Sequence, residues 1–375
     1  MNRILREALL PRVVFLPYLA ARIVLFFTSV ARRLSACQFS GSGNTTLCIE
    51  AGVRGWESIE FKELYQSACE YLQPENVDKL IIHSDIDYLK QVELALASKR
   101  ITHYLYDPRT GSQGFWLGLW QSLMVAIYLQ KYNVVPIVLL TDLSVRTWRS
   151  QSAVVSAQRG LVICFMSVKF VGQIFPHRRL LGPCVMPFSV QTKEMLDALI
   201  WRRPEKSPAK ALFVGSLYEP RTAQLEEVRS SLARRGLLLE IKGRKIGSAR
   251  FPDSEYWQSI CFSDIVVTTS DQMTQKGTDW IDIPHLVYRY MEVLASGALL
   301  VAQDVPSVRR YFTPGEHFIS FDSSSNAAAI IFYYLTNTAE RIKIAKQGKA
   351  RADALIAARS FWILVDSALG ADSMF

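Results

Sequence analysis

The chain has 375 residues, of which half are hydrophobic and 21% are charged. This is the composition of a folded protein, and it excludes an intrinsically disordered chain. The length suits two domains, because single domains cluster near roughly 100–200 residues. The formal net charge is +9, but no basic-aromatic stripe or nucleic-acid-binding motif accompanies it, which argues against a nucleic-acid-binding protein.

The positive charge is concentrated at the N-terminus. Residues 1–34 contain six arginines and one glutamate, and Val13 to Ala31 is an apolar stretch interrupted only by Arg22. A bilayer-spanning helix needs about 20 apolar residues, and both the central arginine and Pro17 oppose insertion. We therefore expect residues 1–39 to form a helical segment that lies on an anionic membrane surface. The alternatives are a helix packed on the first domain and a true membrane span.

After residue 40, short apolar runs alternate with longer helical patterns. Such alternation predicts a parallel sheet with helices on both faces. The predicted strands are Leu47–Gly52, Leu80–His83, Ile101–Tyr106, Val134–Leu140 and Leu161–Met166. The predicted helices are Phe61–Leu72, Tyr88–Ser98, Trp116–Lys131 and Ser167–Phe175. Residues 40–190 are therefore expected to form an N-terminal α/β domain.

Prolines and charges then interrupt this pattern. Five prolines fall between Pro176 and Pro208, and the stretch Arg202–Lys206 is charged. Clusters of this kind are typical of connections between domains. We predict a linker over residues 191–205, with a short helix at Thr192–Trp201 within it.

The alternation of strands and helices resumes over residues 206–355, which predicts a second α/β domain. The predicted strands are Ala211–Val214, Leu237–Ile241, Asp264–Thr268, Ala298–Ala302 and Phe318–Phe321. The predicted helices are Thr222–Arg235, Val287–Ser296 and Ala327–Leu335. A final helix is expected at Ser360–Leu369, within residues 356–375. Open α/β sheets bind ligands at the carboxyl ends of their strands, so a cleft between the two domains is the expected site.

Polar residues at the predicted strand ends of the second domain suit a diphosphate. Gly215, Ser216 and Arg221 follow a strand and lead into a helix, and pyrophosphate is bound by backbone N–H groups at such turns together with a cation. Lys242 and Arg289 are further cations near strand ends. Arg289 also lies three residues before Glu292, so the two could instead form a surface ion pair worth under about 1 kcal/mol.

Several stretches between residues 211 and 348 together resemble the nucleotide-sugar glycosyltransferases of the GT-B fold, especially "glycosyl transferases group 1" C-terminal domains and spore-maturation-like proteins. In chain order these stretches are Ala211–Arg221, Leu239–Arg244, Tyr256–Val267, Glu292–Gly297, Val308–Phe318 and Arg341–Gly348. The resemblance implies two Rossmann-like domains facing across a cleft. It also implies that the C-terminal helix crosses back to the first domain.

The same resemblance implies a hexosyltransferase-type enzyme that moves a sugar from a nucleoside diphosphate sugar to an acceptor hydroxyl. Glu292 would then accept the ribose hydroxyls, and Gly243, Ser296 and Gly297 would belong to the donor site. No metal or other cofactor is expected, because electrostatic stabilisation can serve the departing diphosphate. Many retaining members carry a second glutamate eight residues earlier, where this chain has Pro284. Retaining and inverting chemistry therefore both stay open.

The first domain is expected to bind the acceptor. An inverting enzyme needs a base for the acceptor hydroxyl, and Asp107 and Asp142, each following a predicted strand, are the candidates. The alternative is that these aspartates cap helices or turns. Asp85 and Asp87 form an Asp-x-Asp triplet of the kind that binds a metal in the other large glycosyltransferase fold.

The expected partners are a nucleotide sugar, a glycan or lipid acceptor, and an anionic membrane surface, without nucleic acid. Six scattered cysteines without CxxC spacing are typical of reduced thiols in the cytoplasm. We therefore expect a cytoplasmic protein, peripheral on the inner face of the membrane. The alternative function is a binding or scaffold protein that keeps the GT-B architecture without catalysis.

Overall fold

The computed structural model of the chain forms two compact units. The first unit runs to Cys184 and includes residues from Phe361 onward, and the second takes the described residues between Val185 and Ser360. The residues that the structure describes are 20–28, 44–53, 56–83, 87–108, 115–141, 154–155, 157–158, 160–174, 179–203, 210–245, 251–270, 286–370 and 374.

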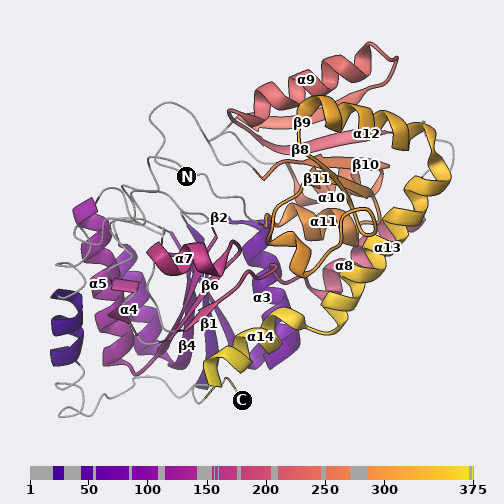
Figure 1. The fold of residues 1–375 in the computed structure, drawn as a ribbon. Helices are drawn as coiled ribbons and strands as arrows, with labels where there is room; N and C mark the ends of the chain where they lie inside the picture. The colour runs from indigo at the N-terminus through magenta and orange to yellow at the C-terminus, as the bar shows by residue number, and fades with distance from the viewer. Residues whose placement is uncertain are drawn as a thin grey trace. The chain divides into compact units, whose positions relative to one another are not determined.

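A mainly parallel sheet forms the core of the first unit (Figure 1). Its strands are β1 (Asn44–Val53), β2 (Trp56–Glu57), β3 (Val77–Ile82), β4 (Arg100–Tyr106), β5 (Val135–Leu140), β6 (Leu161–Cys164) and β7 (Leu180–Leu181). The spatial order is β3-β1-β4-β5-β6-β7, and the short β2 pairs antiparallel with β1. The central strands are apolar along their whole length because both faces of the sheet are covered.

The helices of the first unit include one over residues 20–28 that packs beside α5. The others are α3 (Ile59–Leu72), α4 (Tyr88–Ser98), α5 (Phe115–Lys131), α7 (Val168–Ile174) and α14 (Ser360–Leu369). Ala21 and Leu25 are buried against Ala126 of α5. The rest of the predicted N-terminal segment, residues 1–19 and 29–39, lies outside the described residues. Among the residues that are described, no helix has the length and apolar character needed to cross a bilayer.

The second unit is built on a fully parallel five-stranded sheet. Its strands are β8 (Ala211–Leu217), β9 (Leu239–Lys245), β10 (Ile265–Thr268), β11 (Leu299–Gln303) and β12 (Ile319–Phe321), in the order β12-β11-β10-β8-β9. After β8 the chain forms β9, which pairs with one side of β8, and then β10, which pairs with the other side of β8. The carboxyl ends of β8 and β10 are therefore a topological switch point, where open α/β sheets bind ligands.

Helices cover both faces of this second sheet (Figure 1). They are α8 (Val190–Trp201), α9 (Arg221–Ala233), α10 (Asp253–Cys261), α11 (Arg289–Ala295), α12 (Ser324–Thr336) and α13 (Thr338–Ala357). Helices α9 and α12 pack together on one face, while α10 and α11 lie on the other. Helix α8 occupies most of the stretch where the sequence suggested a linker, and it contacts α10 and α13 within the second unit.

Helix α14 packs within the first unit although α13, which precedes it, belongs to the second. Trp362 is 1% exposed, and its indole N–H donates to Ser67 Oγ on α3 at 3.0 Å. Its ring also stacks on Tyr71, with 6.4 Å between the ring centroids. At the far end of α14, Arg179 donates to the Leu369 carbonyl at 3.2 Å. The C-terminal helix is thus an integral part of the N-terminal unit's core.

Candidate functional site

The switch point of the second unit is bridged by Arg221, the first residue of α9. Its Nε donates to Thr269 Oγ1 at 2.8 Å and Nη2 donates to the Thr269 carbonyl at 3.2 Å, just beyond β10. Nη1 donates to the Ser216 carbonyl on β8 at 3.1 Å. The guanidinium also lies over the Tyr218 ring, 4.2 Å from its centroid. Arg221 therefore holds a positive charge between two strand ends, with N–H groups directed at protein oxygens.

Gly215, near the end of β8, brings the backbone close to a second arginine. Its φ of +151° lies in a region that side chains rarely adopt. A Cβ at this position would lie 3.6 Å from Arg289 Nη2 and 3.4 Å from the Phe213 ring. The glycine thus leaves space beside the Arg289 guanidinium, at the edge of the sheet where β8 ends.

Arg289 belongs to a buried polar cluster rather than to a surface ion pair. Its Nε lies 3.3 Å from Glu292 Oε2, one turn along α11, and its guanidinium lies over the Tyr256 ring at 4.9 Å. The Tyr256 hydroxyl donates to Glu292 Oε1 at 2.6 Å. Glu292 is only 3% exposed. The surface alternative from the sequence is therefore wrong, because α11 directs this face toward α10 instead of solvent.

A buried carboxylate of this kind requires charge and hydrogen-bond partners, since an isolated buried charge is strongly unfavourable. Arg289 supplies the charge and Tyr256 supplies the hydrogen bond. In return, Glu292 fixes the direction of the arginine. The cluster therefore presents an oriented guanidinium at the first residue of α11, beside the Gly215 backbone.

Polar residues that follow β10 complete this edge of the sheet, and the sequence interpretation missed them. Thr269 and Ser270 are both 2% exposed. The Ser270 backbone N–H donates to Gln303 Oε1 at 2.6 Å, and its hydroxyl lies 3.2 Å from the Tyr290 hydroxyl. The signal was present in the sequence, since Thr269 and Ser270 directly follow a buried apolar strand and parallel strand ends share one edge.

Lys242 and Gly243 were assigned to the donor site but have other surroundings. Lys242 Nζ donates to Ser259 Oγ of α10 at 2.8 Å and lies 3.6 Å from Glu255 Oε1. Gly243 pairs with Gly215 in the sheet register, and a Cβ there would overlap the Leu217 side chain. The structure thus gives Lys242 carboxylate and hydroxyl partners on a helix, and gives Gly243 a packing role.

Ser296 and Gly297 lie at the C-terminal end of α11, away from Arg289 at its start. At 1.5 Å per residue, the seven residues of α11 extend over about 10 Å. Ser296 Oγ donates to the Val293 carbonyl at 2.7 Å, and Gly297 adopts φ +74°, as residues that end helices commonly do. Both residues therefore terminate the helix before β11 instead of joining the Arg289 cluster.

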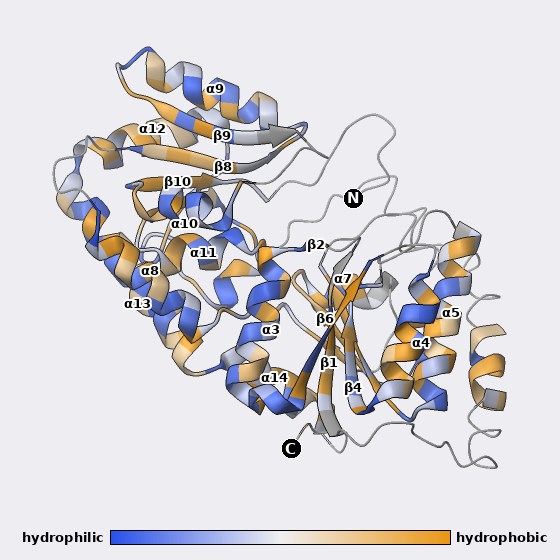
Figure 2. Ribbon diagram, turned by 180° about the vertical axis from the view of Figure 1, so that it is seen from behind, coloured by the Kyte–Doolittle hydropathy of each residue, from blue (hydrophilic) through white to orange (hydrophobic). Residues whose placement is uncertain are grey.

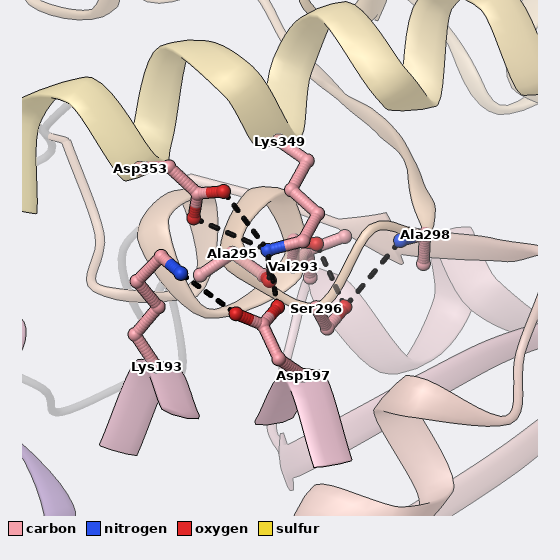
Figure 3. Close-up of polar contacts among 8 residues, drawn as sticks. All are labelled: Lys193, Asp197, Val293, Ala295, Ser296, Ala298, Lys349 and Asp353. Carbon is pink, nitrogen blue, oxygen red and sulfur yellow. Dashed lines mark hydrogen bonds and ion pairs between the residues drawn. The ribbon is translucent and has the colours of Figure 1, made fainter. Parts of the chain in front are cut away.

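A charge network surrounds that helix end (Figure 3). Lys349 Nζ donates to the Ala295 carbonyl at 3.2 Å and pairs with Asp197 at 2.7 Å and Asp353 at 3.1 Å. Lys193 pairs with the same Asp197 at 2.7 Å. A cation at a helix C-terminus is favoured by the helix dipole. The network joins α8, α11 and α13, and we assign it to the stability of the second unit.

In the first unit, Asp107 directly follows β4 and is 4% exposed. Thr141, directly after β5, donates to Asp107 Oδ2 at 2.7 Å. Asp142 lies outside the described residues. The chain order also reverses between β1 and β4, so Asp107 stands at the carboxyl edge of this sheet, next to its switch point.

Glu50 of β1 is a second buried carboxylate in this unit, and the sequence interpretation missed it. Its Oε2 accepts hydrogen bonds from the hydroxyls of Tyr104 at 2.7 Å and Tyr88 at 3.2 Å. Burial, reinforced by the Glu50 charge, raises the pKa of both tyrosines well above the ordinary value. Both tyrosines therefore stay protonated donors. A lone glutamate inside the apolar run of β1 was the available signal.

The Asp-x-Asp triplet falls partly outside the described residues, since Asp85 is among the residues not described. Asp87 immediately precedes α4 and makes no side-chain cap hydrogen bond there. Within the described ranges, no three His, Cys, Asp or Glu side chains gather closely enough to hold a metal ion.

Comparison with known proteins gives one family match and a set of similar structures. Residues 223–359 match the family model described as "Glycosyl transferase-like". No curated protein matches the sequence.

Two of the similar solved structures illustrate the match, which extends over most of both chains. One is HepE from Anabaena in complex with UDP-glucose, at 14% identity and a TM-score of 0.54, covering 87% of this chain and 99% of the other. The second is sucrose-phosphate synthase from Thermosynechococcus elongatus, at 13% identity and a TM-score of 0.56, covering 85% and 97%. At these identities the likeness shows the fold.

Proposed function

Because the chain has the GT-B fold, with two Rossmann-like α/β units, we propose that it is a glycosyltransferase using a nucleoside diphosphate sugar. The observation that carries this proposal is the oriented Arg289 guanidinium beside Gly215 at the carboxyl edge of the second sheet. The family match over residues 223–359 supports it, and so does the UDP-glucose bound by HepE, which shares the fold.

The diphosphate of the donor would lie along the edge formed by β8 and the start of α11. Arg289 offers a guanidinium, and the backbone at Gly215, which has no side chain, permits close approach. Arg221 adds positive potential between β8 and β10. As the sugar leaves, negative charge grows on the diphosphate oxygens, and these fixed cations stabilise that charge without having to reorganise.

Glu292 would act through Arg289 in this arrangement. Both of its carboxylate oxygens already have protein partners, Tyr256 and Arg289, and the residue is nearly inaccessible. We therefore propose Glu292 as the residue that positions the diphosphate-binding arginine. The resemblance had suggested a direct contact with the ribose hydroxyls. The two roles predict different effects of a Glu292 substitution on the affinities for the nucleoside and for the nucleoside diphosphate.

The transferred group would be a hexose, and the first unit would supply the acceptor site. Asp107 is the proposed general base, because it lies at the carboxyl edge of β4 and its Oδ2 is already oriented by Thr141. Its Oδ1 would then accept the acceptor hydroxyl proton. The proposed acceptor is a glycan or a lipid on the inner face of the membrane. A cytoplasmic location agrees with the free thiols of the five described cysteines.

A non-catalytic scaffold is the second candidate. It is favoured by Pro284, which stands where many retaining relatives have a glutamate, and by the engagement of Glu292 with protein groups. This candidate predicts that a nucleotide sugar is not consumed, whatever its affinity. The glycosyltransferase proposal predicts slow hydrolysis of the matching donor even without an acceptor.

The test is a titration of the purified protein with UDP, GDP, ADP and their glucose or mannose conjugates, followed by thermal unfolding with and without Mg²⁺. Ligand at 100 times its dissociation constant should add about 2.7 kcal/mol to the free energy of unfolding. Selective stabilisation by one nucleotide supports the transferase if the sugar conjugate of that nucleotide also releases the nucleoside diphosphate over time. Stabilisation without turnover favours the scaffold. No response to any nucleotide at millimolar concentration refutes the transferase and leaves the scaffold.

A further inference from the structure

A cavity of about 280 Å³ opens in the first unit between the helix of residues 20–28 and the C-terminal end of α5. Figures 1 and 2 both show this helix beside α5, and Figure 2 colours it mostly apolar. Its buried residues Ala21 and Leu25 pack against Ala126 of α5. The volume is close to the lower limit for ligand pockets, about 300 Å³, and is nearly twice that of an engineered cavity of about 150 Å³ that binds benzene. A compact body of about two fused rings therefore fits the cavity.

The cavity is separate from the proposed acceptor site. Its floor includes the start of β5, where Val135 is paired with His103 of β4. Asp107 lies four residues beyond His103, and at about 3.3 Å per strand residue the two positions are about 13 Å apart. The cavity therefore lies toward the amino edge of the sheet, whereas Asp107 stands at the carboxyl edge.

The cavity lining combines an aliphatic wall with a cation at the opening. Leu25, Leu129 and Val134 belong to the aliphatic part. Arg22 also lines the cavity and is exposed, so its guanidinium stands at the opening. Among the described residues, no acidic side chain forms an ion pair with Arg22. A guanidinium without a carboxylate partner, next to an apolar wall, favours an anionic group on a ligand whose body is apolar.

Gln130 supplies a second polar group to the cavity lining. Its Oε1 atom is buried and accepts no hydrogen bond from the described part of the chain. A buried acceptor without a donor is unfavourable, because folding has removed the hydrogen bonds that water made to it in the unfolded chain. A hydroxyl or N–H group of a ligand would restore such a bond. The lining therefore favours a ligand that carries a hydrogen-bond donor as well as an anionic group.

We propose that this cavity is a second ligand site of the protein, for a small molecule with a compact apolar body, one anionic group and one hydrogen-bond donor. The anionic group pairs with Arg22, the donor bonds to Gln130 Oε1, and the body contacts the aliphatic wall. Binding at this site requires neither the nucleotide nor turnover, so the proposal goes beyond the transferase activity and does not depend on it.

Three fluorescent two-ring compounds test the separate parts of this proposal on the full-length protein. The compound 6-hydroxy-2-naphthoate carries the apolar body, the anionic group and the donor. The compound 2-naphthoate lacks the donor, and 2-naphthol lacks the anionic group. Equilibrium dialysis against the wild-type protein should show one binding site for 6-hydroxy-2-naphthoate, with an affinity about tenfold or more above the affinity for either of the other compounds.

Two substitutions remove the polar groups one at a time. Arg22→Gln should weaken the binding of both acids about tenfold or more, because charge-assisted hydrogen bonds are the stronger kind, and should leave 2-naphthol binding unchanged. Gln130→Leu should remove the advantage of 6-hydroxy-2-naphthoate over 2-naphthoate. Lys90→Gln is the matched control, because it removes an exposed cation of α4 in the same unit, outside the cavity lining. This variant should bind all three compounds like the wild type.

Thermal unfolding without ligand checks that each variant is folded. Gln130→Leu should be at least as stable as the wild type, because it removes a buried acceptor that has no donor. Gln130 is carried by α5, so this variant tests the site independently if Arg22→Gln misfolds. Absence of wild-type binding at millimolar concentration would overturn the proposal, as would equal affinity for the three compounds. Unchanged binding in both variants, or displacement of the compounds by a nucleotide, would place them elsewhere on the protein and reject the cavity as their site.

Discussion

At the scale of single residues, the central feature is a buried ion pair whose members differ in what they offer a ligand. Arg289 lies beside the Gly215 backbone at the sheet edge, whereas Glu292 is enclosed by Tyr256 and Arg289. Removing either partner leaves the other charge buried and poorly compensated. Substitutions must therefore be compared with controls for stability before effects on binding are interpreted.

Replacement of Arg289 separates the contribution of the phosphates to affinity from that of the base and ribose. Arg289→Met should lower affinity for the preferred nucleoside diphosphate at least tenfold, because hydrogen bonds to charged groups contribute about 1.5–3 kcal/mol. Affinity for the corresponding nucleoside should be unchanged. Lys242→Met is the control, since Lys242 has partners on α10, and it should leave both affinities near wild type. Isothermal titration calorimetry measures all four values, and a large loss in Lys242→Met would restore that residue to the donor site.

Replacement of the glutamate decides between positioning and ribose contact. If Glu292 acts through Arg289, Glu292→Gln should weaken binding of the nucleoside diphosphate and spare the nucleoside. A direct ribose contact would weaken both by a similar factor. Tyr256→Phe removes the other hydrogen bond to the carboxylate and should have a smaller effect of the same kind. Thermal unfolding of each variant, measured before titration, identifies losses that come from misfolding.

His317 is expected to make the second unit sensitive to acid. Its Nδ1 accepts the Thr313 backbone N–H at 2.8 Å, and its pKa is lowered, mainly by burial, with Arg351 acting in the same direction against Glu316. The unfolded chain thus binds a proton more readily than the folded chain. The stabilising contribution is complete above the unfolded pKa of about 6.5 and is lost as pH falls through the lower folded value.

Urea unfolding between pH 7.5 and 5 should therefore show decreasing stability on acidification. His317→Asn keeps an acceptor for the Thr313 N–H but cannot be protonated, so its stability should vary less over the same pH range. An unaltered pH dependence in this variant would show that other groups are responsible.

At the scale of elements, α13 packs closely on α11 and on the segment that contains His317, and a charge contact also joins α13 to α11. Lys349 of α13 reaches the Ala295 carbonyl at the end of α11 (Figure 3). One residue earlier, Gly348 lies against the His317 carbonyl and the Leu294 side chain, and a Cβ would overlap both. The glycine is therefore required by packing between elements, although helices intrinsically favour alanine over glycine by about 1 kcal/mol.

Gly348→Ala should accordingly destabilise the protein. We expect a net loss of about 1–3 kcal/mol in the free energy of unfolding, because the cost of overpacking exceeds the gain in helix propensity. The free energy of unfolding from urea titration measures the effect. Lys346→Ala, an exposed position two residues earlier on the same helix, is the control and should be close to neutral. A stabilised Gly348→Ala variant would mean that α13 can shift without cost, contrary to the observed contact.

At the scale of the whole molecule, the last helix ties the C-terminal end of the chain into the core of the N-terminal unit. Trp362 is almost fully buried between α14 and α3 and is anchored by Ser67 and Tyr71. The first unit therefore cannot complete its core until residues from the end of the chain are present. Folding of this unit depends on contacts between residues nearly 300 positions apart in sequence.

Trp362→Ala should cost about 3–5 kcal/mol, which is typical of removing a buried aromatic side chain. The neighbouring Ile363 is 52% exposed, so Ile363→Ala provides a matched control and should cost much less. Unfolding followed by circular dichroism and by Tyr and Trp fluorescence would measure both. Equal losses of unfolding free energy in the two variants would show that the contacts of Trp362 with α3 contribute little to stability.

The sequence by itself determined most of the strands and helices of both units. Parallel strands such as β5, β6, β10 and β11 are buried on both faces, so each appears as an uninterrupted apolar run bounded by turns. The order of these runs predicted two α/β domains, the resemblance of residues 211–348 to GT-B glycosyltransferases implied the GT-B fold, and the structure shows that fold. The short strands β2 and β7 were not predicted, because two-residue strands carry no periodicity.

Only the tertiary structure decided which polar residues share an edge. The family resemblance placed Ser296 and Gly297 in the donor site together with Arg289. These residues lie at opposite ends of α11, so they are at opposite edges of the sheet. Conversely, Arg221 and Thr269 are 48 positions apart and meet because β8 and β10 are neighbours. Strand order and the direction of each side chain come from long-range packing, which no local pattern encodes. That packing is what brings Gly215, Tyr256, Arg289 and Glu292 into one cluster.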